Sequence, residues 1–215
     1  KKILFTGGGS AGHVTPNLAL FPQLLAEGCE LHYAGTRDGI ERELIEGRAG
    51  ITYHAIQSGK LRRYFAWKNF TDPFRVLAGV AEAGAVMSRV RPDVVFSKGG
   101  FVSVPVVLAA KARGVPVVTH ESDYTPGLAN RINARFATKI CVTFEDTLKY
   151  TGEKGVHTGT PIRPELYLGK RAKGLDFLGF SGEKPVLLVM GGSLGAAAIN
   201  QAVRGSLGAL TRSFD

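Results

Sequence analysis

The sequence predicts an α/β fold in which a parallel β-sheet is covered by helices on both faces. Strand-like and helix-like patterns alternate along most of the chain, which is typical of repeated βα units. Glycine clusters follow three strand-like segments, at 7–12, 99–100 and 191–195, where the chain must turn sharply into a helix. Pro16 and Pro126 stand near expected helix starts, where a missing N–H costs little.

The apolar patterns assign the elements in order. We expect strands at 3–6, 30–34, 52–56, 93–96, 115–119, 138–142 and 186–190. We expect helices at 15–27, 39–46, 73–90, 103–113, 126–136 and from about 196 to 210. The segment 165–185 is rich in glycine and charge and predicts a linker. The domains are therefore expected at 1–164 and at 186–215, the latter only the truncated start of a second domain.

The composition favours an acidic partner. The 215 residues carry 27 Lys and Arg against 18 Asp and Glu, so the net charge is +9. Such a balance suits nucleic acid, anionic lipid or a phosphorylated substrate. Cys29 and Cys141 are predicted to be reduced and buried, which fits a cytoplasmic compartment. We expect neither a signal peptide nor a membrane span, since no apolar run reaches about 20 residues.

The first glycine cluster matches a dinucleotide-binding pattern only in part. Gly7, Gly9 and Gly12 fit G-x-G-x-x-G after a strand. That pattern also needs an acidic residue at the end of the second strand, and the next carboxylate there is Asp38. A P-loop is excluded because no Gly-Lys-Ser/Thr follows. An anion-binding turn and a tight turn without a ligand both stay open.

His13 closes this cluster at the expected start of a helix. The positive end of the helix dipole disfavours an imidazolium by about 0.3–1 kcal/mol. A neutral imidazole beside a bound anion can act as a general base for a hydroxyl group. Helix capping or phosphate contact is the equal alternative. The remaining histidines are expected to be structural, because they lack metal-ligand spacing: His32, His54, His120 and His157.

Five motifs, in this order, resemble the MurG family in its Gram-positive form. They are GGGSAGHVTPNL at 7–18, SKGGFVSVP at 97–105, HESDYTPGLAN at 120–130, GTPIR at 159–163 and GGSLGA at 191–196. The resemblance implies a GT-B type fold, in which two Rossmann-like domains face each other across a cleft. This chain would hold the N-terminal portion, with the acceptor domain and the first βα unit of the donor domain, and would be an inactive fragment.

The same resemblance implies the partners and the reaction. N-acetylglucosamine would move from UDP-N-acetylglucosamine to the muramyl 4-hydroxyl of undecaprenyl-diphosphate-muramyl-pentapeptide, lipid I, which gives lipid II in peptidoglycan synthesis. The displacement would be inverting, with an oxocarbenium-like transition state. No D-x-D motif occurs in the chain, so no cofactor is expected to be required, with a divalent metal as the alternative. Helix N-termini and Arg163 would supply the positive charge.

Roles carry over by position. His13 is the candidate catalytic base. The chain has Asp123 where an amide is usual, which makes Asp123 a second candidate base, and it has Ala11 where a glycine is usual. The residues expected to bind the substrates are Ser10, Ala11, Gly12, Gly99, Gly100, Asn130, Arg163 and Ser193.

A basic and aromatic segment at 60–75 predicts contact with an anionic bilayer. It contains Lys60, Arg62, Arg63, Lys68 and Arg75 beside Leu61, Tyr64, Phe65, Trp67, Phe70 and Phe74. A half-buried connecting segment is the alternative, and a lipid-tailed acceptor favours docking. We therefore expect a peripheral protein at the cytoplasmic face of the cell membrane. Nucleic acid is not expected, because no recognition motif accompanies the charge.

Three other functions stay open at this point. One is a different GT-B glycolipid glycosyltransferase, whose acceptor would differ while its loops stay similar. Another is a nucleotide-binding oxidoreductase, which the absent ribose carboxylate opposes. The third is a non-catalytic binding module.

Overall fold

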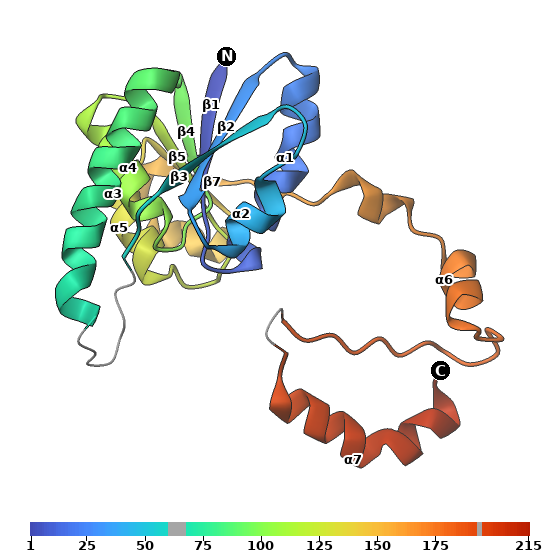
Figure 1. The fold of residues 1–215 in the computed structure, drawn as a ribbon. Helices are drawn as coiled ribbons and strands as arrows, with labels where there is room; N and C mark the ends of the chain where they lie inside the picture. Colours follow the sequence, from blue (N-terminus) through green and yellow to red (C-terminus); the bar gives the residue numbers. More distant parts are fainter. Residues whose placement is uncertain (60–67, 193–194) are drawn as a thin grey trace. The chain divides into compact units, whose positions relative to one another are not determined.

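The computed structural model describes residues 1–59, 68–192 and 195–215 (Figure 1). It divides into two compact units, Lys1–Arg163 and Pro164–Asp215. Among the described residues, no helix combines the length and the apolar character needed to cross a bilayer. Cys29 and Cys141 are free thiols that are only partly buried, so they are less enclosed than the sequence predicts.

The described part of the first unit is built on one seven-stranded sheet in the order β3-β2-β1-β4-β5-β6-β7. The strands are β1 (Lys2–Thr6), β2 (Glu30–Thr36), β3 (Ile51–Ile56), β4 (Val94–Ser97), β5 (Val117–Glu121), β6 (Lys139–Val142) and β7 (Gly155–His157). All neighbouring strands run parallel, which confirms the predicted class. The sequence does not predict β7, because three residues are too few to show a strand period.

Helices cover both faces of this sheet (Figure 1). One face carries α1 (Thr15–Ala26) and α2 (Ile40–Ile45), and the other carries α3 (Lys68–Val90), α4 (Ser103–Ala112) and α5 (Leu128–Phe136). The short 3-10 helices are η1 (Ala11–His13), η2 (Glu145–Tyr150) and η3 (Gly152–Lys154). The α3 helix begins five residues before the expected position 73, so part of the basic and aromatic segment is helical.

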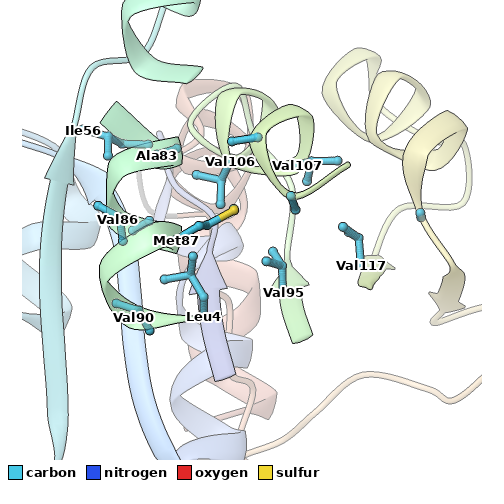
Figure 2. Packing of buried hydrophobic residues seen from close by; sticks show 14 of the residues in the cluster. Leu4, Ile56, Ala83, Val86, Met87, Val90, Val95, Val106, Val107 and Val117 are labelled. Atoms are coloured by element: carbon cyan, nitrogen blue, oxygen red, sulfur yellow. The ribbon is translucent and has the colours of Figure 1, made fainter. Parts of the chain in front are cut away.

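Two apolar cores hold these layers together, one on each face of the sheet. Successive side chains of a strand point to opposite faces. Leu4 of β1 therefore packs with the α3 and α4 residues Met87 and Val106, as Figure 2 shows, whereas Phe5 packs with the α1 residue Phe21 on the other face. Burial on both faces explains why the inner strands β1 and β4 have nearly continuous apolar sequences.

The second unit, Pro164–Asp215, contains η4 (Pro164–Leu168), α6 (Arg171–Leu178) and α7 (Ala197–Ser213). The helix expected near its end is present, and α6 lies within the stretch expected to be a linker. The strand expected at 186–190 is not formed in the described structure. A strand needs a neighbouring strand for its backbone hydrogen bonds, and here Leu187 N–H instead donates to the Asp215 carbonyl at 2.9 Å. Leu188 and Met190 remain about three-quarters exposed, at 75% and 73%.

Candidate functional site

The loops that follow β1, β4 and β5 meet because these strands are neighbours in the sheet. The chain leaves β1 toward β2 on one side, while β4 lies on the other, so the strand order reverses between β1 and β4. In open parallel sheets a crevice forms at such a reversal, beyond the carboxyl ends of the strands. A cleft of about 1040 Å³ lies at this place. Its lining includes the predicted site residues Ser10, His13, Gly100, Asp123 and Asn130.

The two glycine loops beside this cleft contact each other through their backbones. Gly8 N–H donates to the Gly99 carbonyl at 3.3 Å. Gly100 has φ +76°, and a Cβ on it would lie 2.2 Å from the Gly8 carbonyl oxygen. A Cβ on Gly99 would lie 2.3 Å from Asn130 Oδ1. Only glycine allows both the left-handed backbone and this close approach.

His13 is the last residue of η1, two positions before the first residue of α1, and is partly buried. Its Nδ1 is hydrogen-bonded to Ser10 Oγ at 2.9 Å. Burial lowers the pKa of His13, and the Lys98 ammonium lowers it further, while the carboxylates of Asp123 and Glu121 act in the opposite direction. Burial and the Lys98 ammonium therefore bias the ring toward its neutral form, the form that a general base needs.

The loop after β5 is folded around the buried carboxylate of Glu121. This carboxylate accepts hydrogen bonds from Asp123 N–H at 2.8 Å, Gly127 N–H at 3.2 Å and Asn130 Nδ2 at 2.9 Å. The loop so formed leaves Asp123 exposed at the edge of the cleft. Asn130 Oδ1 is a buried acceptor that has no hydrogen-bond partner within the described residues.

Glu41 holds the first glycine loop through a hydrogen bond to its backbone, a role that the sequence does not predict. Its carboxylate is fully buried and accepts hydrogen bonds from Gly9 N–H at 3.2 Å and from Thr36 N–H at 2.9 Å. The only sequence signal for its burial is its position four residues before Ile45 in a short helix. The backbone N–H groups of residues 10–12 make no hydrogen bond within the described part of the chain, so they remain available to an anion.

Lys98 is a second residue that the sequence analysis did not single out. It directly follows β4 and is only 1% exposed. Its Nζ donates to Ser122 Oγ at 2.5 Å. Burial lowers the pKa of Lys98, while Glu121 and Asp123 act to raise it. The sequence could have indicated this burial, because Lys98 stands between an apolar strand and two glycines.

Several predicted site residues lie elsewhere or cannot be placed. Ala11 and Gly12 form η1 beside the cleft, whereas Arg163 is exposed at the end of the first unit. Ser193 lies outside the described residues, as do residues 60–67 of the basic and aromatic segment.

The other histidines take part in structural contacts. His32 lies 2.9 Å from Glu30 and 3.0 Å from His54, and His120 Nε2 bonds to the Gly159 carbonyl at 2.8 Å. Within the part of the chain that the structure describes, no group of three or more His, Cys, Asp or Glu side chains could hold a metal ion.

Comparisons with known proteins agree with this architecture. Residues 3–142 match the model of the glycosyltransferase family 28 N-terminal domain. The chain is 59% identical over 215 residues to a protein of Lachnospira eligens and 55% identical over 216 residues to a protein of Clostridium tetani. Both relatives are named UDP-N-acetylglucosamine–N-acetylmuramyl-(pentapeptide) pyrophosphoryl-undecaprenol N-acetylglucosamine transferase. These matches take in 100% of this chain and 60% of each relative, so the chain spans about 60% of their length.

A solved structure, that of Acinetobacter baumannii MurG, superimposes with a TM-score of 0.71 at 29% sequence identity. The match covers 96% of this chain and 55% of that one. This likeness confirms the GT-B type of fold that the sequence predicts. Since the family model covers well over half of its residues, the chain belongs to glycosyltransferase family 28.

Proposed function

We propose that this chain is the N-terminal, acceptor-side portion of an inverting glycosyltransferase. The enzyme would transfer N-acetylglucosamine from UDP-N-acetylglucosamine to the muramyl 4-hydroxyl of lipid I. The observation that carries the proposal is the convergence of two glycine loops, a neutral-biased histidine and an exposed carboxylate on one cleft. The names of the relatives support the choice of substrates.

His13 is the proposed general base. When its Nδ1–H donates to Ser10 Oγ, its Nε2 carries the lone pair that can accept the proton of the acceptor hydroxyl. The hydroxyl oxygen forms its bond to the anomeric carbon as the bond to the UDP oxygen breaks. Asp123, which lines the same cleft, is the alternative base.

The diphosphates are proposed to bind at backbone amides. The free N–H groups of Ser10, Ala11 and Gly12 suit a phosphate oxygen, and the loop at Gly99 and Gly100 lies against them. The cleft-facing Asn130 is proposed to contact the substrates, and Arg163 and Ser193 are proposed to serve the donor diphosphate. We propose that no cofactor is required. Transfer should then persist with excess chelator, and a loss that added magnesium restores would refute this point.

The deciding experiment is a transfer assay with labelled UDP-N-acetylglucosamine and a lipid I analogue, using the full-length enzyme that contains this chain. His13→Ala is expected to lower kcat by about 10²–10⁴-fold if His13 is the base. A loss below about tenfold, together with a far larger loss in Asp123→Asn, would assign the base to Asp123. Absence of transfer to lipid I, with transfer to another glycolipid, would replace the proposed acceptor.

We also propose that the protein docks peripherally on the cytoplasmic face of the cell membrane. In the described part of α3, Phe74 and Leu77 are 73% and 66% exposed beside the exposed Arg75. Apolar side chains with a neighbouring cation suit an anionic bilayer surface. Co-sedimentation with anionic vesicles should occur and should weaken with added salt. Binding that is equal for neutral and anionic vesicles, or that is absent, would contradict this docking.

A further inference from the structure

Lys98 occupies a position where a charged side chain is costly. It follows β4 immediately, its N–H donates to the Thr6 carbonyl at 2.9 Å, and it is 1% exposed. A Cβ on Gly7 would lie 3.1 Å from the Lys98 Cβ, so the lysine stem leaves the backbone against the glycine loop after β1. A buried ammonium is tolerated only when neighbouring groups compensate its charge.

The compensation comes from the loop after β5. Lys98 Nζ donates to Ser122 Oγ, and Ser122 stands between the acidic residues Glu121 and Asp123. The backbone of the same loop is held by Glu121, which accepts the Asp123 N–H at 2.8 Å. The ammonium therefore links the ends of β4 and β5, next to Glu121 and Asp123, which line the cleft.

The charged and titratable groups that act on His13 come from two of these loops. Lys98, after β4, disfavours the protonated ring, whereas Asp123 and Glu121, from the end of β5, favour it. The same lysine also disfavours protonation of His120 in β5. Without the ammonium, burial would still lower the pKa of His13 and the two carboxylates would still raise it, but one of the lowering effects would be lost. The His13 ring would then take up a proton more readily.

We propose that Lys98 is a positioning residue of this site, whose buried ammonium holds the loop 121–123 beside the glycine loops and opposes a positive charge on the nearby His13 ring. Its catalytic meaning rests on the proposed function, because only an unprotonated ring can accept the proton of an acceptor hydroxyl. The charge state of the ring, however, is a property of the folded chain and can be measured without substrate.

The test is an NMR titration of the 215-residue chain with isotope-labelled histidine, in which the Cε1–H signal of His13 is assigned with a His13→Gln variant. In the unaltered chain the midpoint is expected below about 6.5, the ordinary value for histidine. Lys98→Met keeps an apolar stem and removes the charge, so the midpoint should rise to higher pH. Ser122→Ala is the matched control, since it removes the hydrogen bond but keeps the ammonium, and should shift the midpoint by less.

An unchanged His13 midpoint in Lys98→Met, or an equal shift in Ser122→Ala, would overturn the proposal. If Lys98→Met does not fold, Lys98→Gln takes its place in the titration. A His13 midpoint at or above about 6.5 in the unaltered chain would by itself overturn the proposal. In the full-length enzyme the acid limb of kcat/KM should move to higher pH in Lys98→Met, whereas a merely structural loss would lower the rate equally at every pH. A shifted midpoint in an enzyme that does not act on lipid I would refute the proposed function and leave this inference standing.

Discussion

Gly100→Ala tests the close approach of the two glycine loops, on which the cleft depends. Gly100 has φ +76°, and an L-residue in this region costs about 1–2 kcal/mol. The added Cβ would also lie 2.2 Å from the Gly8 carbonyl oxygen and 3.2 Å from His13 Nδ1. Because the nearest atom belongs to the backbone, it cannot rotate away, and forced shifts of this kind cost about 1–3 kcal/mol. The expected loss of unfolding free energy is therefore about 2–5 kcal/mol.

Gly114→Ala provides the matched control for this change. Gly114 has φ +69°, but nothing lies within 4 Å of a Cβ built there. Only the backbone strain applies, so the expected loss is about 1–2 kcal/mol. The difference between the two variants isolates the contact between the loops from the cost of the left-handed conformation.

Urea unfolding followed by circular dichroism measures both losses. With a slope of about 2 kcal/mol per molar urea, the midpoint should fall by about 1–2.5 M in Gly100→Ala and by about 0.5–1 M in Gly114→Ala. Equal midpoints in the two variants would show that the loops do not approach as closely as the structure places them. If Gly100→Ala is as stable as the unaltered chain, the left-handed backbone conformation of Gly100 is refuted as well.

Two further predictions concern buried charges. Burial lowers the pKa of His13, His54 and His120 in the folded chain, so the unfolded chain binds more protons at pH values just below the ordinary histidine pKa. The free energy of unfolding should therefore fall as the pH drops from about 7 to 5.5. A urea midpoint that stays level over this range would contradict the prediction. Glu41→Ala removes the acceptor of the Gly9 and Thr36 N–H groups and should lower the free energy of unfolding by about 3 kcal/mol, as measured by thermal or urea unfolding. Glu43→Ala, at an exposed position of the same helix, is the control and should change it by less than about 0.5 kcal/mol. Similar losses in both variants would mean that the buried carboxylate does not support the loop.

The fold class could be predicted because its determinants are local. The inner strands β1, β2, β4 and β5 are largely buried, so short apolar runs mark them in the sequence. The strand expected at 186–190 was wrong for the complementary reason. Its apolar residues satisfy the local pattern, but a strand exists only where a neighbouring strand supplies hydrogen bonds, and here the Leu187 N–H donates to the Asp215 carbonyl instead.

The place of the site was also predictable, because parallel strands bring their carboxyl ends to one edge of a sheet. The sequence therefore predicts glycine loops along one edge of the sheet, and the structure brings two of them, with His13, to one cleft. Arg163, which only the family resemblance suggests, does not line that cleft, and its role at the donor diphosphate stays a prediction.

Only the tertiary structure decided which charges are buried and what compensates them. Glu41 meets the amide of Gly9, and Lys98 meets the hydroxyl of Ser122, across 32 and 24 residues of sequence. No local pattern contains such pairs, because the free energy of a buried charge depends on groups that folding brings to it from other loops. The sequence by itself determined the sheet, the turns and the candidate base, whereas the protonation bias of that base was decided by neighbours that only the folded chain assembles.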